Sequence, residues 1–532
     1  MAKPETALGI LACHHTNEFS EEPIMNRLIP EVLDDTVRRF PERTAFTDPV
    51  SSITFSELHH NIEVLASQFA TLCPPRSIIG FYMDKSVLTV TGFLAAVYAG
   101  CAYSQLNLRH PAARILAIAD TLSSPFLVTD RDHEEALRAT GYVGTILLIE
   151  ELLKGDKSPE LLEARRAQML DIDPLYVNFT SGSTGNPKGV VISHRNVMDF
   201  IPDFIRIFKI TETDVLANQA PFDFDVSVKD IYSGLFSGAE VLIVPTPYFT
   251  QPVTLMDYLC DHGTTVMVWA VSALCFLTTM NALQYRTPDK MRMILFSGET
   301  MPIKHLHKLM RALPDVCYVN LYGPTEITCN CTYYIVDRPF EENESLPIGI
   351  PFPNERVFLL DENNNMVTSV GESGEICVSG SCVGLGYLGN TEKTEQAFVQ
   401  NPLNTRWLET IYRTGDLARI NERGEIVYIS RKDFQVKHMG HRIELGEIET
   451  QLSAVPGIER AVCIYLHEKS KILAFIVGNI EKADITEHLR VALPEYMIPN
   501  IYSFVDVMPL NKNGKIDRNL LLQTYLEKKG KH

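Results

Sequence analysis

The sequence predicts an α/β protein in which a large N-terminal domain of helix-covered sheets is followed by a small α+β domain. Apolar strand-like segments alternate with helical segments through most of the chain. Short strands with Gly- and Asn-containing turns replace this alternation after about residue 350, and helices and strands alternate again from about residue 434. Because 532 residues exceed what one hydrophobic core usually serves, we expect at least two domains.

The alternating part begins with a strand at Ile78–Tyr82 and a compact apolar helix at Val87–Tyr98, which stops before Gly100. Further strands are expected at residues 126–128, 145–149, 240–244 and 264–269. Parallel strands need helical crossovers between them. Strands that alternate with helices therefore indicate parallel sheets covered by helices.

The later part predicts two smaller units. Strands at 356–361 and 374–380, with the polar turn Glu362–Asn365 after the first, indicate a small barrel-like β region. The last part of the chain predicts an α+β unit. Its helices are expected at 446–454 and 486–493, and its strands at 461–466, 473–477 and 502–507.

Composition and charge exclude several classes of protein. Hydrophobic residues make up 45% of the chain and charged residues 21%, which is ordinary for a globular protein. A formal net charge of −18 disfavours binding to nucleic acid or to anionic lipid. The sequence shows no signal peptide and no long apolar run, so we expect a soluble cytoplasmic protein without membrane insertion. Eleven cysteines without a CxxC pair favour buried reduced thiols over a zinc site.

The clearest motif follows the strand-like segment Tyr176–Phe179. Glycines let the backbone approach an anion, successive N–H groups form a concave site, and hydroxyls and a lysine add donors. The spacing is not that of the P-loop, and a flexible Ser/Gly loop would not explain the strands on both sides. The motif therefore predicts phosphate binding. We call it the phosphate loop; its residues are Thr180, Ser181, Gly182, Ser183, Thr184, Gly185 and Lys188.

Three weaker motifs lie further along the chain. Asn320-Leu321-Tyr322-Gly323-Pro324-Thr325-Glu326 offers a ring that can stack on a base and a carboxylate that can hold Mg²⁺, or forms an ordinary turn. Asp416, at the end of Tyr412–Asp416, can accept hydrogen bonds from a ribose diol or occupy a turn. Lys515 follows an Asn-Gly turn and, taken alone, is a surface charge.

Together these motifs resemble the adenylate-forming superfamily. TSGSTGNPKG, YGPTE, YRTGD, RKDFQVKHMGHRIELGEIE and NGKIDR follow that family's order and spacing, and the resemblance runs from Ile53 to Arg518. The sequence is most similar to amino acid adenylation enzymes of nonribosomal peptide synthesis, above all to stand-alone D-alanine–carrier protein ligases. The resemblance implies two helix-covered sheets and a small β-barrel-like region within residues 1–432. It also implies a mobile C-terminal lid over residues 433–532, with a hinge at Asp433.

The resemblance implies a role for each motif. The phosphate loop would hold the ATP phosphates, Tyr322 would pack on adenine, and Thr325 would approach the α-phosphate. Asp416 would hold the ribose, and Lys515 would bridge the substrate carboxylate and the α-phosphate. After adenylation the lid would rotate, so that Lys515 leaves and the loop Met439–Arg442 faces the site. The implied catalytic residues are Lys515, Thr184, Lys188 and Glu326, the last as the Mg²⁺ ligand. The implied ATP-binding residues are Thr180–Gly185, Asn320–Thr325, Asp416, Tyr428, Arg431 and Lys515.

Asp225 bears on the class of substrate. In the amino-acid-activating enzymes that the sequence resembles, the aspartate at this position pairs with the substrate α-ammonium; a structural helix cap is the alternative. The implied pocket comprises Asp225, Val226, Lys229, Ser272, Leu295, Ser297, Leu321, Cys329 and Asn330. Lys229 suggests a polar or acidic substrate side chain, or one with an acceptor oxygen, unless it pairs with Asp225 or turns to solvent. D-alanine enzymes usually have an apolar residue at this position and a Cys in place of Ser297, which disfavours D-alanine itself.

We therefore predict ATP- and Mg²⁺-dependent activation of an amino acid to aminoacyl-AMP and its transfer to the phosphopantetheine thiol of a carrier protein. The carrier would be a separate chain, since no LGG[HD]S segment occurs. An acyl- or aryl-CoA ligase that uses free CoA is the alternative enzyme, and Asp225 and the NGKIDR ending count against it. A nucleotide-dependent binding protein on an inactive adenylation fold is the non-enzymatic alternative. Lys515, Glu326 and Asp416 count against that alternative.

Overall fold

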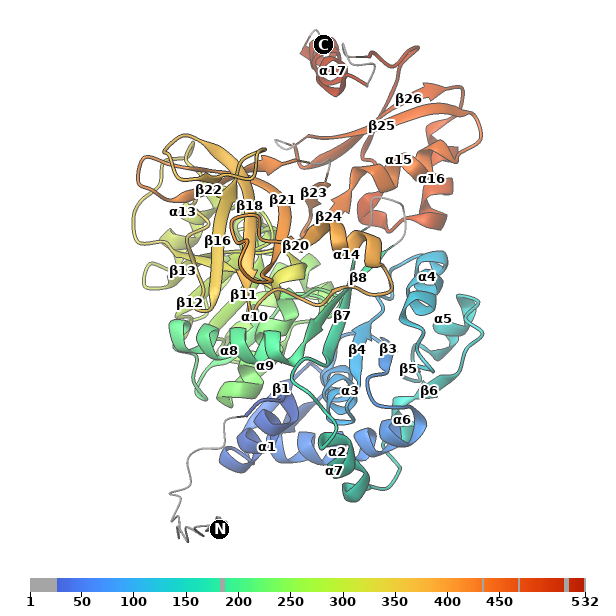
Figure 1. Cartoon of the computed structure of the whole chain (residues 1–532), viewed down its shortest axis with the longest axis vertical. Coiled ribbons are helices and arrows are strands. Elements are labelled where there is room, and N and C mark those ends of the chain that lie inside the picture. Colours follow the sequence, from blue (N-terminus) through green and yellow to red (C-terminus); the bar gives the residue numbers. More distant parts are fainter. Residues whose placement is uncertain (1–25, 182–186, 433–434, 467–468, 511–515, 531–532) are drawn as a thin grey trace, which may run out of the picture.

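A computed structural model describes residues 26–181, 187–432, 435–466, 469–510 and 516–530. It consists of a large N-terminal domain and a smaller C-terminal domain, which lies at the top of Figure 1. The predicted fold class is thus confirmed. The predicted boundary between residues 432 and 433 stays a prediction, and the expected hinge residue Asp433 lies outside the described residues.

One sheet of the large domain has seven strands in the order β19-β8-β7-β4-β3-β5-β6. Their bounds are β3 Ile78–Tyr82, β4 Ala102–Gln105, β5 Leu127–Thr129, β6 Ile146–Leu148, β7 Pro174–Thr180, β8 Lys188–Ser193 and β19 Gly386–Tyr387. The strands from β7 to β6 are parallel, whereas β7–β8 and β8–β19 are antiparallel. The segment between β7 and β8 is too short for a helical crossover, which explains the antiparallel pair that the expectation of parallel sheets missed.

The second sheet has nine strands in the order β15-β14-β13-β12-β11-β9-β10-β1-β2. Their bounds are β1 Thr44–Thr47, β2 Ser52–Thr54, β9 Val215–Asn218, β10 Glu240–Ile243, β11 Val266–Ala270, β12 Met293–Ser297, β13 Cys317–Tyr322, β14 Thr332–Ile335 and β15 Ile350–Pro351. The central strands are parallel, and short connections make both edges antiparallel. The turn between β13 and β14 carries Gly323–Asn330, so this edge positions residues of the predicted site.

Helices cover the two sheets, and one continuous core joins them. Phe81 of β3, Phe93 of α3 and Val268 of β11 belong to the same cluster of buried side chains. Helix α3 is buried on nearly all sides, as its apolar sequence predicts, and the Ser86 hydroxyl accepts a hydrogen bond from the Thr89 N–H at its start. The helices are α1 Ile29–Arg39, α2 Phe55–Leu72, α3 Val87–Tyr98, α4 Ala112–Leu122, α5 Glu134–Ala139, α6 Ile149–Leu152, α7 Pro159–Arg166, α8 His194–Phe208, α9 Val226–Ser237, α10 Pro252–Asp261, α11 Val271–Thr279, α12 Ala282–Tyr285 and α13 Ile303–Ala312.

The predicted β region follows as an antiparallel sheet with its own core. The path β17-β16-β18-β21-β20 includes the long strand β21, which also pairs with β22. Its elements are β16 Glu355–Leu360, β17 Met366–Val367, β18 Ser373–Gly380, α14 Thr391–Ala397, β20 Phe398–Gln400, β21 Thr410–Ile420 and β22 Ile426–Arg431. Tyr322 of β13 packs into the core of this region, which joins it to the nine-stranded sheet.

The small domain contains a hairpin, a three-stranded sheet and packed helices. Strands β25, β26 and β27 pair in that order, and α15 and α16 contribute to the same core. The elements are β23 Gln435–His438, β24 His441–Glu444, α15 Leu445–Ser453, β25 Ile458–Leu466, β26 Lys471–Gly478, α16 Lys482–Ala492, β27 Ile501–Phe504 and α17 Arg518–Gly530. Figure 1 shows the hairpin β23–β24 on the side of this domain that faces the large domain.

Gly349 and Gly371 provide a matched test of the close packing at β14. Both have left-handed φ angles, 86° and 85°. A Cβ at Gly349 would lie 1.9 Å from the Tyr333 backbone oxygen, whereas one at Gly371 would meet nothing within 4 Å. We expect Gly371→Ala to cost about 1 kcal/mol of stability and Gly349→Ala about 3 kcal/mol, because only the latter adds a clash with backbone. Chemical denaturation measures both; equal losses would contradict the assigned packing.

Candidate active site

The phosphate loop begins where strand β7 ends. Thr180 Oγ1 and Asn178 Nδ2 are buried and have no hydrogen-bond partner within the described residues. Lys188, the first residue of β8, is largely buried beside them on the neighbouring strand. Buried donors without partners are costly, so these atoms fit an anionic ligand such as a phosphate. Gly182, Ser183, Thr184 and Gly185 lie outside the described residues.

A second group joins the motifs around Tyr322 and Asp416. The Tyr322 hydroxyl donates to Asp416 Oδ2 at 2.6 Å, and Arg431 Nη1 donates to Asp416 Oδ1 at 2.7 Å. Burial raises the pKa of Tyr322, so its phenol stays protonated as a donor. The structure thus brings together three residues that the sequence assigned to adenine and ribose. Asn320, another predicted ATP-binding residue, donates a hydrogen bond from its side-chain amide to the Pro347 carbonyl oxygen. Tyr428, also predicted to bind ATP, packs against the cluster of buried side chains that contains Tyr322.

Glu326 is fully buried and carries a negative charge. Burial raises the pKa of this carboxyl, but the charges of Arg442 and Lys188 outweigh burial and lower it to about 2. Arg442 Nη1 lies 3.1 Å and 2.8 Å from the two carboxylate oxygens, and the Tyr387 hydroxyl donates to one of them at 2.8 Å. An ionised carboxylate is the ligand that Mg²⁺ prefers, so Glu326 fits the predicted metal role.

The small domain is docked against this site through its hairpin. The Ser181 hydroxyl donates to the Arg442 carbonyl at 2.7 Å, and the Gly440 N–H donates to Glu299 Oε1 at 2.9 Å. A buried ion pair between Arg114 of α4 and Glu447 of α15, 2.6 Å long, adds a contact away from the hairpin. The loop Met439–Arg442 therefore faces the site, as the resemblance implies for the stage after adenylation. Lys515 lies outside the described residues.

Asp225 begins helix α9 without capping it. Its side chain makes no hydrogen bond to the helix N-terminus, which disfavours the structural alternative. Burial raises the pKa of Asp225 above its usual value, although the charge of Lys229 and a hydrogen bond from Thr325 oppose this rise. The carboxylate therefore lies next to Thr325, which the sequence predicts near the α-phosphate, and it is available for a cationic partner.

Lys229 is completely buried, so it does not turn to solvent. Its Nζ donates to Asn330 Oδ1 and lies 3.5 Å from Ser297 Oγ, and it forms no ion pair with Asp225 in the part of the chain described. Burial lowers the pKa of Lys229. Of the remaining predicted pocket residues, Leu295, Leu321 and Cys329 are buried, whereas Val226 and Ser272 are partly exposed.

The sequence did not predict the roles of Tyr387, Glu299 and Lys437 at the site. The Tyr387 hydroxyl donates a hydrogen bond to the Glu326 carboxylate, and Glu299 accepts a hydrogen bond from the Gly440 N–H. Lys437 Nζ lies 6.0 Å from the centre of the Tyr322 ring. Tyr387 stands on the two-residue strand β19, far from any motif, and no pattern distinguishes it. Lys437 lies within the quoted RKDFQVKHMGHRIELGEIE segment, but its position beside Tyr322 depends on how the domains dock.

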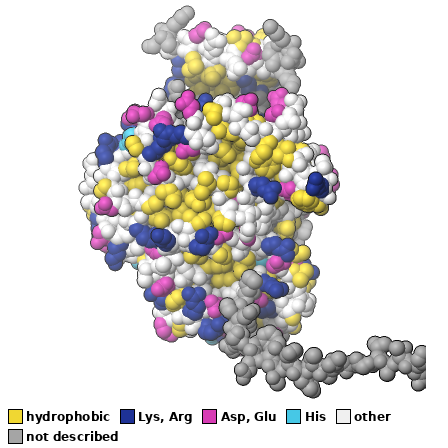
Figure 2. All heavy atoms as spheres, turned by 60° about the vertical axis from the view of Figure 1, so that its left-hand side comes forward, with side chains coloured by type: hydrophobic (Ala, Val, Ile, Leu, Met, Phe, Trp, Pro, Cys, Tyr) yellow, Lys and Arg dark blue, Asp and Glu magenta, His cyan; other side chains and the backbone are white. Residues whose placement is uncertain are grey.

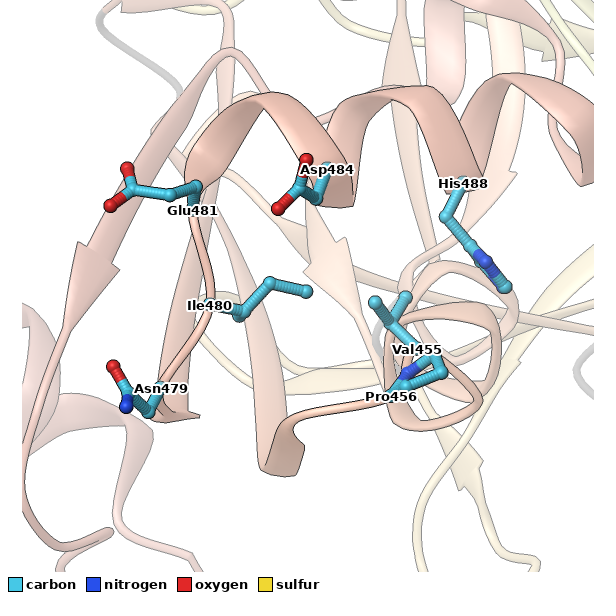
Figure 3. A pocket seen from close by; sticks show the side chains of 7 residues that line it. All are labelled: Val455, Pro456, Asn479, Ile480, Glu481, Asp484 and His488. Carbon is cyan, nitrogen blue, oxygen red and sulfur yellow. The ribbon is translucent and has the colours of Figure 1, made fainter.

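Among the described residues, other surface features carry no comparable cluster of predicted site residues. A hollow of about 510 Å³ on the small domain lies between the end of α15 and α16; Ile480, Val455 and Pro456 line it with Glu481, Asp484 and His488 (Figure 3). The described residues contain no group of three acidic, His or Cys side chains placed to hold a metal ion, and no helix that could cross a bilayer. On the face in Figure 2, apolar side chains gather in patches over the middle of the molecule, with basic and acidic side chains around and between them.

Comparison with known proteins identifies the class of this site and fold. The family model for "AMP-binding enzyme" matches residues 33–388, and the model for "AMP-binding enzyme C-terminal domain" matches residues 447–515. These models and the sequence relatives identify an adenylate-forming enzyme of the type of nonribosomal peptide synthetase adenylation domains. The chain belongs to the AMP-binding enzyme family.

Relatives support this assignment over nearly the whole chain. Zwittermicin A synthase ZmaJ from Bacillus cereus is 32% identical over 93% of this chain and 95% of its own length. Tyrocidine synthase 3 from Brevibacillus parabrevis is 33% identical over 97% of this chain, and surfactin synthase subunit 3 from Bacillus subtilis is 31% identical over 92%. The chain spans only 8% and 38% of the lengths of these last two proteins.

Solved structures share the fold at low sequence identity. An NRPS protein that contains adenylation and PCP domains, PA1221, superposes with a TM-score of 0.81 at 23% identity, over 94% of this chain and 85% of its own. The adenylation domain AlmE from Vibrio cholerae, in complex with glycyl-adenosine-5'-phosphate, gives a TM-score of 0.81 at 20% identity, with 95% and 99% covered. The o-succinylbenzoate CoA synthetase MenE from Bacillus subtilis gives 0.79 at 20% identity, with 93% and 98% covered.

Asp416→Asn tests the nucleotide site. The variant keeps the shape of the side chain but removes the charge that would accept hydrogen bonds from the ribose. We expect AMP to bind roughly 10- to 100-fold more weakly by calorimetry, the range for one charged hydrogen-bonding group. Arg431 also loses its ionic partner, so the melting temperature should fall. A lower melting temperature with unchanged AMP affinity would show that Asp416 is only structural.

Proposed function

We propose that this protein activates an amino acid as aminoacyl-AMP and transfers it to the phosphopantetheine thiol of a separate carrier protein. Asp225 is the observation that carries the proposal. Its half-buried carboxylate neither caps α9 nor forms an ion pair with Lys229 in the described structure, and it lies beside Thr325 of the nucleotide motif. A substrate α-ammonium group would supply the missing cation. Burial of a charge without such a partner is costly.

In the first half-reaction, a substrate carboxylate oxygen attacks the α-phosphorus of ATP. The bond from that phosphorus to the bridging oxygen breaks, and pyrophosphate leaves. The carboxylate is already ionised, so no general base is needed. Mutual repulsion of the anionic reactants is the barrier, which cations at Lys188 and Lys515 would lower. Mg²⁺ on Glu326 would neutralise the departing pyrophosphate. Asp416 would fix the ribose, and Thr180 would donate to a phosphate.

In the second half-reaction, a thiolate sulfur attacks the carbonyl carbon of aminoacyl-AMP, a thioester forms and AMP leaves. The docked loop Met439–Arg442 supports this step, because the family resemblance implies that this loop faces the site after adenylation. PA1221 and the fused NpsA-ThdA protein, both similar in fold, contain adenylation and PCP domains. These proteins support a carrier protein as the acceptor.

A CoA ligase is the second candidate, because MenE, a CoA synthetase, shares the fold. Such an enzyme would place a neutral acyl or aryl chain beside Asp225 and leave its carboxylate unpaired. The two candidates are separated by offering the purified protein, ATP and a labelled amino acid to a phosphopantetheinylated carrier or to free CoA. We expect label on the carrier; label on CoA with an organic acid that lacks an amino group would establish the alternative.

The side chain of the amino acid is proposed from Lys229. Its ammonium contacts Asn330 and Ser297 at the buried end of the pocket. A substrate side chain with a carboxylate or another acceptor oxygen would find three donors there, whereas the methyl group of D-alanine would use none of them. We propose a polar or acidic amino acid as the substrate.

Asp225→Asn and Asp223→Asn form a matched pair of neighbouring substitutions. Asp223 accepts a hydrogen bond from Asn107 and has no assigned role in the site. We expect Asp225→Asn to reduce amino-acid activation about 100-fold or more, because the ammonium would lose its charged partner, with ATP affinity unchanged. Asp223→Asn should retain activity. An equal loss of ATP affinity in Asp225→Asn would favour a structural aspartate.

Lys229→Met tests the side-chain proposal. The variant replaces the buried ammonium by an apolar side chain of similar length. In pyrophosphate exchange across L- and D-amino acids, preference should shift toward small or apolar substrates by roughly 10- to 200-fold, the range for one such contact. ATP affinity should stay unchanged. An unaltered amino-acid profile would show that Lys229 does not read the substrate.

A further inference from the structure

Tyr387 of the short strand β19 contacts two residues of the proposed nucleotide site. Its hydroxyl donates a hydrogen bond to Glu326 Oε1 at 2.8 Å, and Lys188 Nζ lies 5.3 Å from the centre of its ring. Lys188 Nζ also lies 3.7 Å from Glu444 Oε1 of the small domain. One aromatic side chain thus touches both the carboxylate proposed to bind Mg²⁺ and the ammonium proposed to bind phosphate. The two proposed half-reactions give this side chain no task.

The backbone on each side of Tyr387 fixes its position. The Gly384 N–H donates to the Glu326 carbonyl oxygen at 2.9 Å, and the Leu388 N–H donates to the Gly189 carbonyl oxygen at 2.7 Å. Between these two contacts, β19 pairs antiparallel with β8. The segment around Tyr387 is therefore joined both to the residue that carries the carboxylate and to the strand that carries the ammonium.

The charged groups beside Tyr387 are buried. The exposed fraction is 0% for Glu326 and 8% for Tyr387, and the Lys188 side chain is 11% exposed. A buried carboxylate needs hydrogen-bond donors, and a buried ammonium is attracted to the electron-rich face of an aromatic ring. Burial raises the pKa of Tyr387, so its phenol keeps the proton that it donates. Arg442, which also donates to Glu326, belongs to the small domain, whereas Tyr387 belongs to the same domain as Glu326.

We propose that Tyr387 is the positioning residue for the metal-binding and phosphate-binding side chains of this site. Its hydroxyl fixes the orientation of the Glu326 carboxylate, which keeps further lone pairs for Mg²⁺. Its ring holds the Lys188 ammonium in place for the ATP phosphates. Tyr387 acts through these two side chains and not by contact with the substrate. This inference rests on the proposed adenylation reaction.

Two substitutions separate the hydroxyl from the ring. Tyr387→Phe removes only the donor to Glu326, whereas Tyr387→Leu also removes the aromatic face beside Lys188. Calorimetry on the full chain measures the binding of three ligands: ATP with Mg²⁺, ATP with a chelator in place of the metal, and AMP. The first ligand needs Glu326 and Lys188, and metal-free ATP needs Lys188 alone. AMP lacks the two outer phosphates and tests the adenine and ribose contacts.

The two variants should differ in the ligands that they affect. We expect Tyr387→Phe to bind ATP with Mg²⁺ roughly 10- to 100-fold more weakly, the range for one hydrogen bond to a charged group. Its affinity for metal-free ATP and for AMP should stay unchanged. Tyr387→Leu should also bind metal-free ATP roughly two- to tenfold more weakly, because the Lys188 ammonium loses the ring. Unchanged AMP affinity in both variants would show that they are folded.

Tyr98 offers a matched control in the same domain. Its hydroxyl donates to Asp34 Oδ1 at 2.8 Å, Arg166 Cζ lies 4.5 Å from the centre of its ring, and its exposed fraction is 7%. Tyr98→Phe therefore removes a similarly buried hydroxyl from a similar arrangement of carboxylate, ring and cation. This variant should bind all three ligands as the wild type does.

Each contrary outcome has a defined meaning. Unchanged affinity of Tyr387→Phe for ATP with Mg²⁺ would overturn the proposal. An equal loss of affinity for all three ligands, or the same loss in Tyr98→Phe, would also overturn it, because either result would show a structural role. Amino-acid-dependent exchange of ATP with pyrophosphate by the wild type separates this failure from failure of the proposed function. Intact exchange with unaltered binding would reject the positioning role alone, whereas no exchange with any amino acid would reject the adenylation reaction itself.

Discussion

The buried charge on Glu326 is the constraint on which the arrangement of this protein depends. A carboxylate with no exposed surface needs a cation, and in the docked arrangement Arg442 of the small domain provides it. The contact holds together the hairpin β23–β24, the phosphate loop and the turn after β13. Docking of the small domain is therefore coupled to whatever else the site holds. A loosely packed lid without such a pair would lack this coupling.

The large domain supplies the proposed ribose- and substrate-binding groups. Asp416, Tyr322 and Arg431 are fixed to each other by hydrogen bonds between β13, β21 and β22. Asp225 is held at the start of a buried helix, and Lys229 lies one turn further along the same helix. The proposed acceptors for ribose and substrate thus lie on strands and helices of the large domain. The proposed metal ligand, Glu326, and the proposed phosphate-binding cation, Lys188, contact the docked small domain. This division suits an enzyme with two consecutive half-reactions.

Local sequence patterns predicted strands and helices of this protein, because interactions between residues close in the sequence determine where these elements begin and end. Ile78–Tyr82 and Val87–Tyr98 have the predicted bounds, since an uninterrupted apolar run and a capping Ser86 specify them. The phosphate loop was predicted from glycines and hydroxyls after a strand, and its role stays a prediction. The antiparallel edges of the sheets, the pairing of Arg442 with Glu326 and the role of Tyr387 depend on contacts between distant segments. Lys229 was predicted in the pocket, but its complete burial against Asn330 and Ser297 could be known only from the fold.

The most direct measurement is a crystal structure of the protein with Mg²⁺, a non-hydrolysable ATP analogue and an activated amino acid. The account predicts Mg²⁺ on Glu326, the ribose on Asp416 and the amino acid ammonium on Asp225. Arg442 and Glu444 would have moved away from Glu326 and Lys188. A structure that retains the Arg442–Glu326 pair while the magnesium triphosphate occupies the phosphate loop would contradict the account, as would an ammonium group far from Asp225.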